Sequence, residues 1–546
     1  MNQGERAGER WVLPGVGRRH FLIGAAAAAA ALAAGCSSDS DGASSSSTTA
    51  PPKLGSITTE PIAGPDGKPL ALAGDPFSLG VASGDPIADA VVIWTRLAPD
   101  ALAEDGAGGM PAGKFPVVWE VSDTKGFDRN VAQGIAMAEA RFGHSVHVDV
   151  TGLQPATDYW YRFTAGDEVS SVGRTRTLPE GAPTSFGLGI VNCQMYENGA
   201  YGAYRHLVDE DIDLVAHLGD YIYELPGGTG AGRHSVPNRS LKDLTDFRLR
   251  YASYKLDPDL QAAHARFPWV VTWDDHEVAN NYMGDSVPGD APPEVIEARR
   301  TAAYQAWWEH MPVRLDPPKG SSLAVYRDFS IGSLAHLYLL DERQYADPTP
   351  CKGETVGATD YGDCAAVEGE DRTRLGADQE AWLANALESS DATWNLLGNP
   401  VALSGIDAGT DAPAYYLDLW DGYPDARKRL AAQLAKVDNP VVLTGDYHAG
   451  MVLDLHATPF DQESPVVAPE FLAPAISSPL FSQDVTGRTP QLRQQINKHG
   501  YLTVAVTPKQ LTATFRVLDD VKDPKTAIST ESTWQVTKGD PVAKQL

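Results

Sequence analysis

The chain has 546 residues, of which 42% are hydrophobic and 21% charged; this composition is globular and excludes a collagen-like or wholly disordered chain. It carries 44 Lys and Arg against 72 Asp and Glu, and the net charge of −28 disfavours non-specific attraction to nucleic acid or anionic lipid. Four cysteines are too few for a disulfide-rich scaffold. At about 150 residues per domain, the length predicts three or four domains.

Residues 1–36 have the features of an export signal. Arg18 and Arg19 precede the apolar stretch 21–35, which is shorter than the roughly 20 residues of a membrane-spanning helix. The arginine pair resembles a twin-arginine signal, and the residues before Cys36 resemble a lipoprotein cleavage box, although Ala33 stands where leucine is usual. We therefore expect a twin-arginine lipoprotein-type signal with Cys36 lipidated; a plain signal peptide is the alternative.

Residues 37–74 are expected to form a disordered tether, because the Ser/Thr/Pro-rich stretch 37–53 has no large apolar side chains with which to offset the entropy of ordering. Export by the twin-arginine route to the cell surface or the extracellular space is the expected localisation. Membrane contact is expected only through the N-terminal lipid anchor.

Residues 75–180 contain short apolar runs separated by turn residues. Strands are expected at 77–81, 90–95, 117–121, 145–150 and 159–164. The Gly-Leu-x-Pro-x-Thr-x-Tyr-x-Tyr pattern at 152–161 resembles immunoglobulin and fibronectin III sandwiches. We expect a small β-sandwich that acts as a spacer packed against the next domain, because no catalytic constellation lies within it; ligand binding through its loops is the alternative.

Residues 183–520 alternate strands and helices, which predicts an α/β or α+β region with a central sheet covered by helices. Strands are expected at 186–192, 212–218, 269–273, 334–340, 395–398 and 440–445, and helices at 200–209, 240–254, 293–311, 377–389 and 425–437. The second of these helices begins with Ser240 and Asp243 in capping-box spacing. Residues 521–546 are expected to be a C-terminal tail.

Four of the expected strands end in side chains that bind metals: Cys193 after the first, Asp220 and Tyr223 after the second, Asp275 and His276 after the third, and Asp446 and His448 after the last. A thiolate with a phenolate favours ferric iron, whereas carboxylates suit calcium, manganese or magnesium. A carboxylate such as Asp220 can bridge two ions. Such a pair of ions lowers the pKa of bound water and clamps a phosphoryl group.

The joint motif set identifies a family resemblance. The motifs are FSLGVASGDP at 77–86, VNCQ at 191–194, HLGDYIYE at 217–224, FPWVVTWDDHEVANNY at 267–282, LLDERQY at 339–345 and TGDYHAG at 444–450. Together they resemble the alkaline phosphatase D (PhoD-like) family of calcineurin-like metallophosphatases. The resemblance implies a β-sandwich followed by a layered αββα metallophosphatase domain.

The resemblance also implies roles for the strand-end residues. Cys193, Asp220 and Tyr223 match the positions that hold ferric iron, with Asp220 bridging to a calcium-like site at Asp275. His276 matches a catalytic histidine that contacts phosphate or aids the leaving group.

Four further residues are less clearly assigned by the resemblance. Asp446 and His448 fall in the last metal motif, which does not distinguish which of them contacts metal. Asn280 is a weaker metal or phosphate candidate, with helix or loop capping as its alternative. Arg343 either contacts phosphate or forms a salt bridge within the fold.

The implied function is an exported, metal-dependent phosphohydrolase that cleaves phosphomonoesters, with phosphodiesters as a second class, by attack of metal-activated hydroxide on phosphorus. The implied cofactors are Fe³⁺ and one or two Ca²⁺, with another divalent ion left open. The substrate is a small or polymeric phosphate ester, and no specific nucleic-acid partner is expected. A phospholipase D-like phosphodiesterase is one alternative. A non-catalytic cell-surface binding lipoprotein is another, disfavoured because every expected ligand type is present.

Cys351 and Cys364 lie in a Gly/Asp-rich segment and are an extra pair relative to the family pattern. In an oxidising compartment we expect a disulfide that closes this loop and contributes about 3 kcal/mol through loop entropy. A metal site is the minor alternative, because no His or further Cys lies close by in sequence.

Overall fold

The computed structural model describes residues 72, 74–228, 230–287, 292–351, 364, 367, 369–481 and 483–546. The export-signal residues Arg18, Arg19 and Cys36 lie outside this part of the chain, as does most of the expected tether. Residues 53–546 belong to one compact unit. Within the described ranges, no helix combines the length and the apolarity that crossing a bilayer requires.

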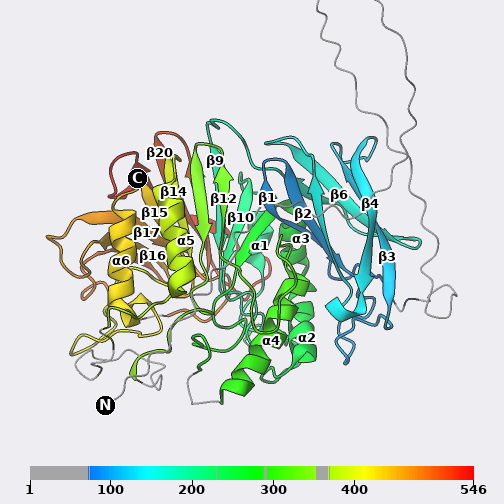
Figure 1. Cartoon of the computed structure of the whole chain (residues 1–546), viewed down its shortest axis with the longest axis horizontal. Helices are drawn as coiled ribbons and strands as arrows, with labels where there is room; N and C mark the ends of the chain where they lie inside the picture. Colours follow the sequence, from blue (N-terminus) through cyan, green and yellow to red (C-terminus); the bar gives the residue numbers. More distant parts are fainter. Residues whose placement is uncertain are drawn as a thin grey trace, which may run out of the picture. The chain divides into compact units, whose positions relative to one another are not determined.

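Two large mixed sheets form the centre of this unit (Figure 1). The ten-stranded sheet has the order β22 (Lys544–Gln545), β21 (Ile528–Thr537), β20 (Gln510–Leu518), β19 (Gly500–Val506), β9 (Phe186–Val191), β10 (Leu214–Leu218), β11 (Pro268–Thr272), β1 (Val81–Ile87), β2 (Ala90–Arg96) and β5 (Ser145–Thr151). The seven-stranded sheet has the order β12 (Arg327–Ile331), β13 (Ala335–Leu339), β14 (Trp394–Asn399), β15 (Pro440–Thr444), β17 (Val466–Leu472), β16 (Gly450–His456) and β18 (Leu492–Ile496). Strands β9, β10 and β11 are parallel neighbours, as are β13, β14 and β15.

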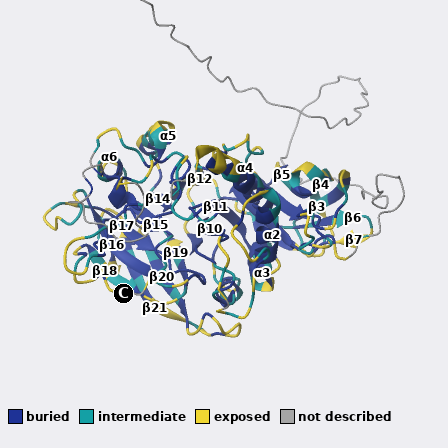
Figure 2. Ribbon diagram, turned by 90° about the horizontal axis from the view of Figure 1, so that it is seen from below, coloured by how far each residue is buried: buried dark blue, intermediate teal, exposed yellow. Residues whose placement is uncertain are grey.

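Apolar residues of both sheets meet in one core that includes Leu214 of β10, Leu396 of β14 and Leu502 of β19. A second core joins β10 and β11 to helices α1 (Gly202–Leu207), α2 (Leu244–Lys255), α3 (Pro258–Arg266) and α4 (Pro293–His310). A third core joins β14 to β16 with helices α5 (Gly376–Glu388) and α6 (Pro424–Leu434). Figure 2 shows that central strands such as β10, β11, β14 and β15 are mostly buried.

The first strands of the chain do not form a separate sheet. β1 pairs in parallel with β11, with Ser83 opposite Pro268, so β1, β2 and β5 extend the ten-stranded sheet. The other strands of this region form a five-stranded sheet, comprising β4 (Asn130–Glu139), β3 (Lys114–Ser122), β6 (Asp158–Ala165), β7 (Glu168–Val169) and β8 (Gly173–Arg176). A core that contains Val91 and Tyr161 lies between the two layers. One layer of the expected sandwich is therefore continuous with the main sheet.

The end of the chain also belongs to the ten-stranded sheet. β21 pairs antiparallel with β20, and Trp534 and Val536 on β21 are buried in the core between the sheets. The expected tail at 521–546 thus contains β21 and β22. Only Trp534 and Val536 alternate with polar residues there, which is a short pattern for a strand of this length.

Helix α2 begins later than the capping-box spacing predicted. Its N-cap is Asp243, whose side chain accepts a hydrogen bond from Asp246 N at 3.0 Å, rather than Ser240. The segment before the helix packs against another loop instead. Leu241 is buried, and its amide donates a hydrogen bond to Glu224 O at 2.9 Å. A tertiary contact therefore overrides the local capping pattern.

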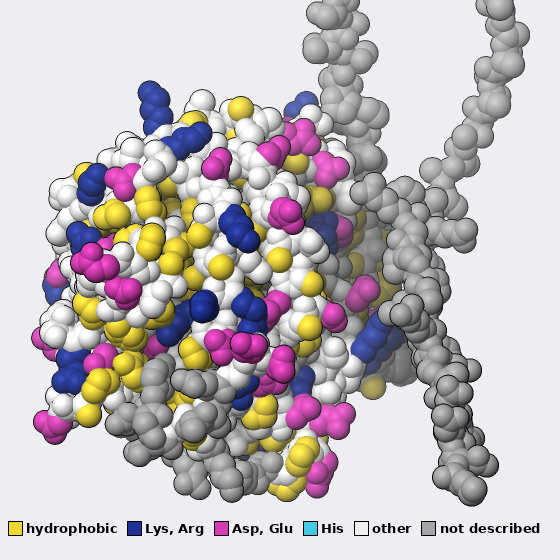
Figure 3. Space-filling view, turned by 60° about the vertical axis from the view of Figure 1, so that its left-hand side comes forward, with side chains coloured by type: hydrophobic (Ala, Val, Ile, Leu, Met, Phe, Trp, Pro, Cys, Tyr) yellow, Lys and Arg dark blue, Asp and Glu magenta, His cyan; other side chains and the backbone are white. Residues whose placement is uncertain are grey.

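The surface carries both signs of charge. Figure 3 shows Lys and Arg side chains interspersed with Asp and Glu over the face in view, despite the net charge of −28. This mixture is typical of a solvated protein surface.

Candidate functional site

The site residues lie where strands of both sheets end. Because β9, β10 and β11 are adjacent and parallel, their carboxyl ends bring Cys193, Asp220 and Asp275 to one edge of the ten-stranded sheet. Asp446 follows β15 of the other sheet. Backbone hydrogen bonds connect the two sheets here, since Ser478 N donates to Cys193 O at 3.1 Å.

The backbone at this edge is strained. Cys193, Asp220, Asp446 and His448 all have positive φ, between 54° and 61°, in the left-handed region that non-glycine residues seldom occupy. Each such residue costs about 1–3 kcal/mol, and strain of this kind concentrates at functional sites. Gly219, with φ of 105°, leaves no space for a side chain, because a Cβ atom would lie 2.5 Å from that of Asp274. Packing of the two loops thus fixes the turn that presents Asp220.

A first group of potential metal ligands consists of Cys193, Asp220 and His448, whose ligand atoms lie within 4.8 Å of one another. The Tyr223 hydroxyl belongs to the same cluster: it donates to Asp220 Oδ2 at 2.7 Å and lies 3.1 Å from His448 Nε2. Ser478 Oγ lies 2.6 Å from that hydroxyl and holds it in place. A thiol, a carboxylate, a phenol and an imidazole therefore converge.

A second group shares Asp220 with the first and adds Asp275 and His276, again with ligand atoms within 4.8 Å. Asn281 N donates to Asp275 Oδ2 at 2.5 Å, which orients that carboxylate. Asp220 is the residue common to both groups, the position that a bridging ligand requires.

Several atoms of these groups fit a cation. Asp220 Oδ1 and Asp275 Oδ1 are buried and have no hydrogen-bond partner among the described residues. Burial, together with nearby Asp220 and Asp446, raises the pKa of the Cys193 thiol well above its usual value. Burial and the neighbouring Asp274 also raise the pKa of Asp446. Buried carboxylates that repel one another are stabilised by bound cations, so the donor set fits metal ions.

His276 is held by a buried carboxylate. Its Nδ1 donates to Glu224 Oε2 at 2.7 Å, and Asn280 N donates to the other oxygen, Glu224 Oε1, at 2.7 Å. Burial opposes a charge on the imidazole, but Asp275, Asp220 and Glu224 together raise the pKa of His276 well above its usual value. Glu224 therefore fixes both the orientation of the ring and the position of one proton.

These residues open into a cavity of about 160 Å³. Its lining consists of Asp275, His276, Asn280, Asn281, Tyr416, Asp418, Leu419, Asp446, Tyr447, His448 and Phe481. The structure thus brings Asp446, Asn280 and both histidines to the same cavity. Cys193, Asp220 and Tyr223 lie beneath it, fully or almost fully buried.

Arg343 is placed differently. Its side chain is fully buried, and its Nε and Nη2 donate to the two carboxylate oxygens of Asp274 at 2.5 and 3.0 Å. It does not line the cavity. The structure contains the salt bridge within the fold. Arg343 also lies 4.0 Å from Asp275 Oδ1 and 3.9 Å from Asp418 Oδ2, so it pairs with two residues of the cavity lining without lining the cavity itself.

Sequence reasoning missed several residues of this site, among them Glu224, Glu277, Asp418 and Ser478. Glu277 accepts hydrogen bonds from the amides of Asp220, Tyr221 and Asp274, and so ties two loops together. Glu224 and Glu277 stand inside the quoted motifs, so their place in sequence was a usable signal. Ser478 and Asp418 lie in irregular segments and gave none.

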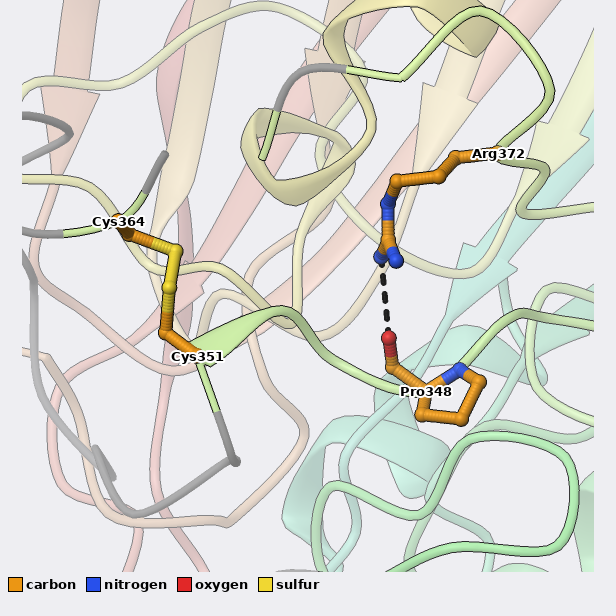
Figure 4. The surroundings of a disulfide bond; sticks show 4 residues. All are labelled: Pro348, Cys351, Cys364 and Arg372. Carbon is orange, nitrogen blue, oxygen red and sulfur yellow. Dashed lines mark hydrogen bonds between the residues drawn. A yellow bond between two sulfur atoms is a disulfide. The ribbon is translucent and has the colours of Figure 1, made fainter. Parts of the chain in front are cut away.

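The disulfide between Cys351 and Cys364 is present, and Figure 4 shows it beside the hydrogen bond from Arg372 to Pro348 O. Cys364 packs with Val367 and Leu417 in a small buried cluster. Leu417 lies between Tyr416 and Asp418, which line the cavity. The disulfide therefore supports one wall of the site from behind.

Comparison with known proteins gives consistent matches. Residues 188–515 match the family described as PhoD-like phosphatase, and residues 65–179 match its N-terminal domain. The chain is 42% identical over 483 residues to alkaline phosphatase D of Bacillus subtilis (strain 168), which covers 85% of this chain and 81% of that protein. A solved structure described as that of PhoD superposes with a TM-score of 0.82 at 40% identity, covering 87% of this chain and 93% of the other.

Proposed function

Because the chain belongs to the PhoD-like phosphatase family and is a phosphoric ester hydrolase, we propose that it hydrolyses phosphomonoesters, with phosphodiesters as a second class, in the cavity that Asp275 and His276 line. The observation that carries this proposal is the pair of ligand groups that share Asp220. One acidic, strained and buried carboxylate between two groups of donors is the arrangement that two-ion phosphoryl transfer needs. We also propose that the two sheets and their flanking helices are the αββα arrangement of metallophosphatases, preceded by a sandwich-like N-terminal region.

We propose that Cys193, Asp220, Tyr223 and His448 hold Fe³⁺, because thiolate and phenolate oxygen suit a trivalent ion. Asp220 and Asp275, with Asp446 at the cavity wall, are proposed to hold Ca²⁺ through hard oxygen ligands. When bound, the ions would lower the pKa of a water molecule and offset the negative charge of the phosphoryl group.

The remaining roles fall to side chains of the cavity. With Nδ1 donating to Glu224, His276 is proposed to donate a proton from Nε2 to the oxygen of the leaving group. Asn280 is proposed to contact phosphate, since its backbone N–H is held by Glu224 and the residue lines the cavity. Arg343 is proposed to act through the carboxylates with which it pairs, which are Asp274, Asp275 and Asp418.

The proposal is tested on protein isolated with its own ions. Metal content per chain is measured first, followed by release of 4-nitrophenol from 4-nitrophenyl phosphate and from bis(4-nitrophenyl) phosphate. We expect iron and calcium in the protein and hydrolysis of the monoester. Fully metal-loaded protein that cleaves neither ester would refute the proposed function.

Tyr223→Phe is expected to remove a visible absorption band and to lower kcat about 10- to 100-fold. The change deletes only the oxygen that contacts Asp220, His448 and Ser478, so the ring and its packing remain. Tyr221→Phe is the matched control, because its hydroxyl lies on the same loop but contacts His264 at 2.8 Å. The absorption spectrum and the iron content are measured. An iron-free, colourless and fully active parent protein would contradict the iron assignment.

We propose further that the protein leaves the cytoplasm by the twin-arginine route and is anchored through a lipid on Cys36. Replacing Arg18 and Arg19 together by Lys is expected to leave most of the precursor inside the cell, because the signal is recognised through both arginines. Fractionation and immunoblotting of precursor and processed forms measure the result. Unchanged export of the double variant would show that another route is used.

A further inference from the structure

One part of the cavity is aromatic and is used by none of the roles above. Tyr416, Tyr447 and Phe481 line it together, and we call these three residues the aromatic wall. The Phe481 ring centroid lies 5.6 Å from that of Tyr447 and 6.1 Å from that of Tyr416. Phe481 nevertheless remains 43% exposed. An apolar ring that is held by neighbours yet left open to a cavity offers a surface for another ring.

The aromatic wall begins next to the proposed metal ligands. The Phe481 ring centroid lies 5.5 Å from that of His448, and His448 Nε2 lies 3.8 Å from Asp220 Oδ2. A phosphoryl group at the ligand groups would therefore have its ester substituent close to Phe481. A ring that is bonded directly to the ester oxygen would therefore be near enough to contact Phe481.

The charges of the lining narrow the choice of substituent. Of the described residues that line the cavity, none is Lys or Arg, whereas Asp275, Asp418 and Asp446 are acidic. A leaving group with its own phosphate or carboxylate would find no Lys or Arg side chain among these lining residues, and His276 is already assigned to the ester oxygen. The volume of about 160 Å³ is also below the roughly 300–1,000 Å³ of pockets that enclose drug-sized ligands.

We propose that the aromatic wall is the leaving-group subsite and that it selects phosphate esters whose leaving group is a flat, uncharged ring bonded directly to the ester oxygen. This inference rests on the proposed phosphatase function. Stacked or edge-to-face contact with Phe481 would hold an aryl group, whereas a flexible polyol gains little from such a surface.

The test compares phenyl phosphate with glycerol 1-phosphate in the metal-loaded protein. For each variant, kcat/KM for the aryl ester is divided by kcat/KM for the glycerol ester, so that the higher intrinsic reactivity of the aryl ester cancels between variants. Phe481→Ala is expected to lower this ratio about tenfold. Phe481→Leu, which is apolar but not flat, is expected to lower it as well, whereas Phe481→Tyr keeps the ring and the ratio.

Ile135→Ala is the matched control, because Ile135 is an apolar side chain with 56% exposure on β4 of the five-stranded sheet. Its ratio is expected to equal that of the parent. An unchanged ratio in Phe481→Ala overturns the inference, while hydrolysis of both esters leaves the proposed function standing. A metal-loaded parent that cleaves no ester refutes the proposed function itself.

Discussion

Asp220→Asn is expected to lower phosphatase activity by about 10³-fold or more and to reduce the number of ions bound per chain. Asp220 is the one residue common to both ligand groups, and its Oδ1 is buried without a hydrogen-bond partner among the described residues. Asparagine tolerates the positive φ at this position better than most residues, so the turn is expected to persist. Activity, metal content and Tm are measured on the same preparation.

Asp540→Asn is the matched control for this substitution. Asp540 is also a loop carboxylate, but it pairs with Lys544 at 2.9 Å near the end of the chain and lines no part of the catalytic cavity. The control is expected to keep the activity and the ions of the parent. An Asp220→Asn protein that retained both ions and full activity would contradict the bridging role.

His276→Gln is expected to lower kcat about 10²- to 10⁴-fold while the ions remain bound, because a proposed proton donor is lost without loss of a proposed metal ligand. Glu224→Gln should lower kcat by a smaller factor, because it weakens the hydrogen bond at Nδ1 but leaves the imidazole in place. Steady-state kinetics with metal analysis separate the two effects.

His336→Gln is the corresponding control, since His336 also pairs with a carboxylate, Asp328, at 2.6 Å, but on strand β13 away from the cavity. It is expected to leave kcat unchanged. Loss of the ions in His276→Gln would instead assign His276 to metal binding, and an unchanged kcat would exclude it from catalysis.

The candidate site was largely predictable because its residues directly follow buried strands. Local apolar runs located β9, β10, β11 and β15, and the ends of parallel strands converge in any such sheet. Asp418 and Ser478 could not be found in this way, because each reaches the site through an irregular segment whose path only the tertiary structure determines. The burial of Arg343 could not be predicted from the sequence either, because its partner Asp274 is distant along the chain.

The fold was predictable to the level of mixed sheets with flanking helices, and the partners of the strands were not. Periodicity shows that Val81–Ile87 is extended, but it carries no information that this strand lies beside β11. The position of β21 is equally unpredictable from periodicity, because nothing in residues 528–537 indicates that they pair with β20 in the central sheet. Long-range pairing depends on complementary surfaces, which a single sequence does not display.

The strand order of the ten-stranded sheet also bears on how the chain folds during synthesis. β9 lies between β10 and β19, with Ile190 opposite Leu502. One edge of β9 therefore stays unpaired until β19, which is near the end of the chain, has been synthesised. The sheet cannot close until nearly the whole polypeptide has left the ribosome, and pairing over such sequence separation is intrinsically slow. The nascent chain therefore exposes an open, apolar β-edge for most of translation, where chaperone binding would protect it from aggregation.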